Sequence, residues 1–191
     1  MHDAVRQTLV DTVQVGVGVL VVSSLLFGLT GVWPPMVAVE SGSMEPHMER
    51  GDLIVVAEPT RDGPGTAAGV VPTADAPADG RTLGARGDVI VFDSPTKPGS
   101  PIIHRAHLYV EAGENWYGEA DPAFLPPDVD SCRDLADCPA PYAGFVTKGD
   151  ANERYDQVNG NSPLVRPDRI RAEARLRIPL LGHIRLTISG A

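Results

Sequence analysis

The chain has 191 residues, enough for one domain of ordinary size and too few for two large ones. Its 16 basic and 25 acidic residues give a formal net charge of −9, which argues against a protein that coats nucleic acid, since such proteins carry a basic stripe. Two cysteines exclude a disulfide-rich scaffold and most cysteine-based zinc modules. Apolar residues make up 42% of the chain, and many of them are concentrated near the N-terminal end.

The first expected element is a transmembrane helix over residues 12–33, after a short tail at residues 1–11. No charged residue lies between Asp11 and Glu40. As a helix, these 22 residues would rise about 33 Å, against a hydrocarbon core of roughly 30 Å. Trp33 falls where an aromatic belt residue belongs, and the two prolines that follow it would end the helix.

Two other interpretations of this apolar segment are less well supported. A cleavable signal peptide is disfavoured, because the apolar stretch is long and only Arg6 supplies positive charge before it. A buried core helix is disfavoured, because the rest of a domain this small could hardly cover it. We therefore expect a membrane anchor.

Residues 36–191 predict a mainly β, mostly antiparallel domain. Short β-rich runs are separated by Gly and Pro, and helical periodicity is hard to find. The expected strands lie at 36–39, 52–57, 88–92, 102–110, 115–118, 144–147, 175–178 and 183–188. We interpret the C-terminal apolar segment as strands because it is short and is interrupted by His183 and Arg185, which gives a single-pass protein.

Two loop insertions interrupt the β pattern. Residues 59–86 are rich in Pro, Gly, Ala and Thr, with almost no large apolar residue, and predict a surface insertion that is free to move. Residues 119–141 contain several prolines and both cysteines. Cys132 and Cys138 are close enough in sequence to bridge a tight loop if the domain lies outside the cytoplasm, and two free thiols are equally compatible with the sequence.

A candidate nucleophile follows the anchor in the segment Ser-Gly-Ser-Met-Glu-Pro at 41–46, a turn that leads into a strand. A nucleophilic serine needs a base within hydrogen-bond reach. His104 and His107 are the best candidates, and strand alternation puts them on opposite faces, so that at most one shares a face with the serine. His47 lies in a turn, where we expect a surface residue. His2 precedes the anchor, and His183 has no acidic neighbour in sequence.

Candidate acids lie in and after the segment Thr-Lys-Gly-Asp-Ala-Asn at 147–152. Asp150 and Asp156 flank a loop of five residues that follows a predicted strand. Taken alone, each would be interpreted as a turn aspartate that caps its own backbone.

Four motifs occur in order along the chain: Ser-Gly-Ser-Met-Glu-Pro at 41–46, Gly-Asp-Val-Ile-Val-Phe at 87–92, Ile-His-Arg at 103–105, and Thr-Lys-Gly-Asp-Ala-Asn at 147–152 followed by Asp156. Together with the leading anchor, they resemble type I signal peptidases of peptidase family S26. The resemblance is to the archaeal and endoplasmic-reticulum branch, in which a histidine occupies the position that lysine holds in the bacterial enzymes. It implies an antiparallel β catalytic domain preceded by one transmembrane helix.

The resemblance also implies a role for each matched residue. Ser43 matches the nucleophile, His104 the general base and Asp156 the carboxylate that completes the site. Asp150 matches a second, supporting acid. Ser41 matches an oxyanion-hole position, and the backbone N–H of Ser43 would be the other donor. Neutral imidazole suits this role, because it can accept the serine proton near pH 7.

As a member of this family, the protein would be a membrane-anchored serine endopeptidase that removes signal peptides from secretory preproteins after small residues. Its implied partners are those preproteins, the lipid bilayer and the secretion translocon, with no nucleic acid. The catalytic domain would lie on the extracytoplasmic side of the cell membrane. No metal and no cofactor are expected, because the histidines and cysteines lack a metal-ligand spacing.

Two further hypotheses remain open on sequence grounds. A self-cleaving Ser/Lys protein of the repressor type would need a strand lysine and a DNA-binding helix pair, and neither Lys97 nor Lys148 stands where such a base is expected. A membrane-tethered β-rich binding module without activity is the other, although Ser43, His104 and Asp156 are all present.

Overall fold

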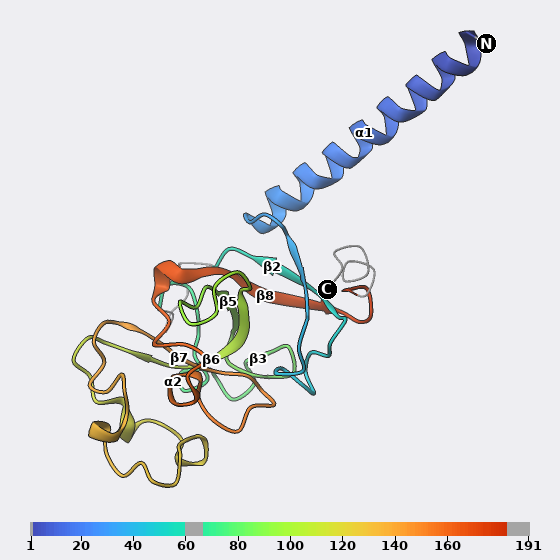
Figure 1. Ribbon diagram of the computed structural model, residues 1–191. Coiled ribbons are helices and arrows are strands. Elements are labelled where there is room, and N and C mark those ends of the chain that lie inside the picture. The colour runs from blue at the N-terminus through green and yellow to red at the C-terminus, as the bar shows by residue number, and fades with distance from the viewer. Residues whose placement is uncertain (1, 60–66, 183–191) are drawn as a thin grey trace.

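A β-sheet domain and one long N-terminal helix make up the protein, in a computed structural model that describes residues 2–59 and 67–182 (Figure 1). Helix α1 (His2–Thr30) extends away from the sheet. Its apolar part, Leu9–Thr30, has 22 residues and none of its most apolar window is buried, so it is long and apolar enough to cross a membrane.

Helix α1 ends three residues before the predicted boundary at Trp33. Gly31 adopts a left-handed conformation with φ of 72°, and its N–H donates to the carbonyl of Phe27 at 2.8 Å. A glycine in this conformation is a common way for a helix to end, because it lacks the Cβ that disfavours positive φ. The helix therefore stops at Thr30 and not at the prolines.

The predicted antiparallel β domain is confirmed. Six strands form one sheet in the order β1-β2-β8-β5-β6-β7, and every neighbouring pair is antiparallel. The strands are β1 (Met36–Ala38), β2 (Leu53–Ala57), β5 (Val89–Phe92), β6 (Ile102–Val110), β7 (Gly144–Lys148) and β8 (Ile170–Ile178). All four side chains of β5 are buried, because this strand lies inside the sheet and both of its faces are covered.

Two details of the strand prediction differ from the structure. Residues 115–118 are not a strand, because Trp116–Gly118 form a 3-10 turn that Asn115 caps through its side chain. Strand β8 begins five residues earlier than expected, since pairing with β5 and β2 on its two sides extends it. The expected strand at 183–188 lies outside the described residues.

The segment 67–86 is not the loose insertion that its composition predicts. Val70 is fully buried, and the N–H of Thr73 donates to the carbonyl of Ala106 on β6 at 2.9 Å. A short hairpin, β3 (Arg81–Thr82) and β4 (Ala85–Arg86), ends the segment. The segment therefore belongs to the wall of the domain that packs against β6.

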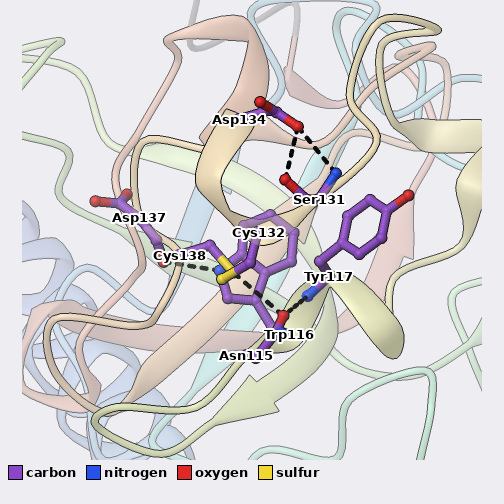
Figure 2. Close-up of a disulfide and its surroundings, with 8 residues drawn as sticks. All are labelled: Asn115, Trp116, Tyr117, Ser131, Cys132, Asp134, Asp137 and Cys138. Carbon is purple, nitrogen blue, oxygen red and sulfur yellow. Dashed lines mark hydrogen bonds between the residues drawn. A yellow bond between two sulfur atoms is a disulfide. The ribbon is translucent and has the colours of Figure 1, made fainter.

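The second insertion forms a lobe next to β6 and β7, at the end of the molecule away from α1 in Figure 1. Figure 2 shows that Cys132 and Cys138 are bridged beside the fully buried Trp116. The indole N–H of Trp116 donates to the carbonyl of Asp137 at 2.8 Å. The structure thus favours the bridged alternative, and the disulfide belongs to the core of the lobe.

Candidate active site

Ser43 lies in the turn between β1 and β2, and buried methionines hold that turn in place. Met44 and Met48 are almost fully buried, and the N–H of Met48 donates to the carbonyl of Met44 at 3.0 Å. The carbonyl of Ser43 accepts a hydrogen bond from the N–H of Ala151 at 2.9 Å, which fastens this turn to the loop that follows β7. The Ser43 hydroxyl therefore has a defined position at the edge of the sheet.

His104 of β6 joins Ser43 to Asp156. Its Nε2 lies 3.0 Å from Ser43 Oγ, and its Nδ1 lies 2.6 Å from Asp156 Oδ2. The His104 side chain is 6% exposed and the Asp156 side chain is fully buried. The structure thus brings together the three residues that the motifs single out, although they are 61 and 52 residues apart in sequence.

Gly149 leaves the space in which these side chains meet. A Cβ at this position would lie 2.5 Å from the Ser43 carbonyl oxygen and 2.9 Å from His104 Nε2. Any side chain would therefore displace the serine turn or the imidazole. This close approach explains why the Thr-Lys-Gly-Asp motif has a glycine at position 149.

Asp156 is the first residue of the short helix α2 (Asp156–Asn159), and several donors stabilise its charge. Besides His104, the hydroxyl of Thr147 donates to Oδ2 at 2.7 Å and the side-chain amide of Asn161 donates to Oδ1 at 3.1 Å. A buried carboxylate needs such partners, because an unpaired one would lose its hydration without compensation.

Asp150 does not contact His104 and pairs instead with Arg105. The guanidinium donates to its two oxygens from Nε at 2.8 Å and Nη2 at 2.6 Å, and His47 Nδ1 lies 2.8 Å from Oδ2. Burial acts to raise the pKa of Asp150, but the hydrogen bonds and positive charge of Arg105, followed by those of His47, hold the pKa below its ordinary value.

Arg105 extends this pair to the hairpin. Its Nη1 donates to the carbonyls of Gly87 at 2.7 Å and Thr82 at 2.9 Å. Asp150 thus links the loop after β7 to the β3–β4 hairpin through a buried arginine.

Ser41 lies next to the candidate nucleophile. Its hydroxyl oxygen is 3.2 Å from that of Ser43, and its side chain is exposed. A hydroxyl here could donate to an oxygen that develops negative charge beside Ser43.

The contacts of Lys148 do not favour a role as the catalytic base. It is 4% exposed, and its ammonium donates to the carbonyls of Gly149 at 3.0 Å and Asn152 at 2.8 Å. The same ammonium lies 4.4 Å from the centre of the Phe124 ring. Burial lowers the pKa of Lys148, although the charges of Asp150 and Asp156 act in the opposite direction.

An open cleft of about 590 Å³ passes over Ser43 and His104. One of its sides is formed by β1 and residues 40–41, and the other by residues 100–103 at the start of β6. The described part of the chain has no group of three or more His, Cys, Asp or Glu side chains that could hold a metal ion.

A comparison with protein families identifies the chain. The model of the family described as "Signal peptidase, peptidase S26" matches residues 10–106, just over half of the chain. The chain belongs to the signal peptidase family. No curated protein matches it. As a member of this family it is a peptidase with signal-peptide-bearing substrates. The matched segment contains most of the apolar helix together with Ser43 and His104, and it ends before Asp150 and Asp156.

Two other histidines of this signal peptidase family member lie in buried or partly buried positions. His47 is only partly exposed, at 29% for its side chain, because it bonds Asp150 and is not a free surface residue. His107 lies at a β-bulge between Ala106 and Leu108, and its ring packs in T-shaped contacts with the rings of Phe124 and Tyr155. Burial, followed by the charge of Lys148, lowers the pKa of His107 to about 4, so it is neutral at pH 7.

Sequence reasoning missed Thr147 and Asn161, the two residues that donate to Asp156. Thr147 lies inside a recognised motif, but a strand threonine gives no sign of which way its hydroxyl points. Asn161 follows Gly160, and this glycine was the only available signal that the chain turns back toward α2.

Proposed function

We propose that this protein is a membrane-anchored serine endopeptidase that removes signal peptides from secretory preproteins. One observation supports the proposal most strongly: the two nitrogens of His104 lie 3.0 Å from Ser43 Oγ and 2.6 Å from Asp156 Oδ2 at the same time. A histidine between a serine and a buried carboxylate, at the floor of an open cleft, is the arrangement that activates a serine for attack on a carbonyl.

The reaction begins when His104 Nε2 accepts the Ser43 proton while Oγ attacks the scissile carbonyl carbon. Asp156 accepts the hydrogen bond from His104 Nδ1, which fixes the tautomer and stabilises the imidazolium. The imidazolium then returns the proton to the leaving amine, and an acyl-enzyme on Ser43 remains. Water attacks this ester with His104 as base again, and Ser43 is released.

The tetrahedral intermediate carries an oxyanion that needs donors. The Ser41 hydroxyl and the backbone N–H of Ser43 are the proposed donors, and the 3.2 Å separation of the two hydroxyl oxygens supports Ser41 in this role. The loss of one such donor costs about 10²-fold or more in kcat in other hydrolases.

Lys148 is not the base in this proposal, because backbone carbonyls already accept its N–H donors. We assign this chain to the archaeal and endoplasmic-reticulum branch, in which a histidine is the base, and we propose Asp150 as a supporting acid.

The substrate is an extended peptide with small residues at the first and third positions before the cut. The cleft is bounded by β1, a strand at the edge of the sheet, and edge strands bind extended peptides through backbone hydrogen bonds. Pairing with β1 would carry the scissile bond past Ser43, which follows this strand by five residues.

We propose that α1 from residue 12 onward is the membrane anchor, with residues 1–11 as a short tail, and that the β domain with its two insertions is the catalytic unit. Only residues 31–42 separate the end of α1 from Ser43, which would hold the nucleophile near the bilayer surface where a signal helix ends. A disulfide forms in oxidising compartments, and this supports an extracytoplasmic catalytic domain. The bilayer and the secretion translocon are its proposed partners.

The test is to incubate membranes that carry the protein with a secretory preprotein and to sequence the N-terminus of the product. The parent chain should cut at one site after a small residue, whereas Ser43→Ala should give no product. Ser131→Ala, which removes a hydroxyl in the disulfide lobe, serves as the matched control and should cut like the parent. Cleavage by Ser43→Ala at the parent rate would refute the assignment of the nucleophile.

A further inference from the structure

The polar residues that surround Asp156 include one side chain that no motif predicts. Oδ2 of Asp156 accepts hydrogen bonds from His104 and Thr147, and Oδ1 accepts one from the side-chain amide of Asn161 at 3.1 Å. Asn161 therefore binds Oδ1 of the proposed catalytic acid, the carboxylate oxygen that does not face His104.

Asn161 reaches this oxygen because the chain reverses directly after α2. Gly160 has φ of 76°, and its N–H donates to the carbonyl of Asp156. The N–H of Asn161 donates to the same carbonyl at 3.1 Å. The backbone N–H and the side-chain amide of Asn161 thus both donate hydrogen bonds to Asp156, the residue whose carboxylate must be oriented.

Lys97 determines which end of the Asn161 amide faces Asp156. The ammonium of Lys97 lies 2.9 Å from Asn161 Oδ1. An ammonium can only donate and an ionised carboxylate can only accept, so the amide oxygen must face Lys97 and the NH₂ group must face Asp156. In the reversed orientation the NH₂ group would face the ammonium of Lys97 and the amide oxygen would face the carboxylate of Asp156, and both contacts are unfavourable.

The backbone carbonyl of Asn161 also holds the loop that carries Lys97. It accepts hydrogen bonds from the hydroxyls of Ser94, at 3.0 Å, and Thr96. This loop leads into residues 100–103, which form one side of the cleft, and both Lys97 and Asn161 line that cleft. Asn161 therefore connects the cleft wall to the catalytic acid.

We propose that Asn161 is a positioning residue for Asp156, and that Lys97 acts through it by fixing the orientation of its amide. This inference rests on the proposed function, because it assigns Asn161 to the carboxylate that orients His104. Asn161 acts on the rate of the chemical step through Asp156 and His104, and it does not react itself.

The test compares Asn161→Ala, Lys97→Met and the double variant in preprotein cleavage. Loss of a hydrogen bond to a charged group is expected to lower kcat about tenfold in Asn161→Ala while KM changes less than about twofold. Lys97→Met should lower kcat about threefold, and the double variant should be no slower than Asn161→Ala, because Lys97 acts only through that amide. Arg166→Met removes an exposed cation outside the cleft and is the charge-matched control.

A spectroscopic measurement separates positioning from general damage to the fold. The proton that His104 Nδ1 shares with Asp156 is expected to give a downfield NMR resonance, which should move in both single variants and stay in place in Arg166→Met. An unchanged kcat and an unchanged resonance in Asn161→Ala would overturn the inference. If Asn161→Ala does not fold, the Lys97→Met variant, which changes an exposed side chain, provides the test. A kcat and a resonance equal to those of the parent in Lys97→Met would then overturn the inference.

Failure of the inference and failure of the proposed function give different results. If the parent cuts and Ser43→Ala does not, the proposed function stands, and parent-like Asn161→Ala and Lys97→Met refute the inference alone. If Ser43→Ala cuts as fast as the parent, the proposed function fails and the inference fails with it.

Discussion

Hydrogen bonds to single buried side chains decide which residues of this protein can take part in proton transfer. His104 has one nitrogen directed at a hydroxyl and the other at a carboxylate, so it can accept and return a proton. Lys148 is only one residue from Gly149, which touches the site, but its ammonium is directed at carbonyl oxygens. Asp150 is fully engaged by Arg105 and His47. This leaves Asp156, which contacts His104, as the proposed acid of the site.

The Thr147 hydroxyl is expected to contribute to catalysis by holding the same Asp156 oxygen that His104 contacts. Thr147→Val keeps the shape of the side chain and removes this donor, so kcat/KM for preprotein cleavage should fall about tenfold. Thr147→Ser retains the hydroxyl and should keep most of the activity. Equal rates for the two variants would show that the hydroxyl plays no part.

At the residue scale, the motifs predict the residues of the candidate site but not the residues that hold them in place. Ser43, His104 and Asp156 stand out because of their neighbours in sequence, and their catalytic roles stay predictions until they are tested. The contact between His47 and Asp150 joins residues 103 apart. It could not be predicted, because it depends on how the serine turn packs against the loop after β7.

At the scale of elements, β6 matches its predicted bounds and β8 does not, for a physical reason. The residues 102–110 are rich in β-branched and aromatic side chains, whereas the start of β8 contains Arg, Ala and Glu, which have low β propensity. Strand β8 forms because it lies between β2 and β5 and pairs with both. Tertiary pairing overrides local preference there, and it buries Glu173 in the middle of the sheet.

Glu173 makes the stability of the sheet depend on pH. Burial, followed by the nearby negative charge of Asp88, raises the pKa of Glu173 to about 8, so the folded protein holds a proton at pH 7 that the unfolded chain has released. Stability from this group is present below the unfolded pKa of 4.5 and is lost as pH rises toward 8.

A neutral isostere should remove this dependence. Glu173→Gln is expected to raise the free energy of unfolding by a few kcal/mol at pH 9 and to change it little at pH 4.5. Thermal melts of parent and variant across this range measure the effect, and Glu49→Gln, an exposed carboxylate, is the control. A Glu173→Gln variant less stable than the parent at pH 9 would contradict the argument.

At the scale of the whole molecule, the sequence average conceals two parts of opposite character. Nearly all of the charge belongs to the β domain, whereas α1 exposes apolar side chains along its length. This division, the antiparallel sheet and the signal peptidase family were all predictable, because hydropathy and ordered motifs are properties of the chain itself. The packing of 67–86 into the wall was not predictable, since its composition resembles a loose loop.

The proposed anchor predicts that the full chain stays in the membrane pellet after alkaline extraction. Val19→Arg combined with Val22→Arg should release part of it to the supernatant, because each arginine near the centre of a span costs about 2.5–3.5 kcal/mol. Val19→Leu with Val22→Leu is the matched control and should stay in the pellet. Quantitative extraction of the parent chain would contradict a membrane-spanning α1.

The central claim is that Ser43 is activated by His104 and not by a lysine, and the rate of preprotein cleavage by His104→Ala and Lys148→Met tests it most directly. Circular dichroism melts of both variants establish that they are folded. We predict that His104→Ala lowers kcat by at least about 10³-fold, whereas Lys148→Met retains measurable cleavage. Full activity in a folded His104→Ala variant would contradict the account. Complete loss of cleavage in Lys148→Met but not in His104→Ala would contradict it as well.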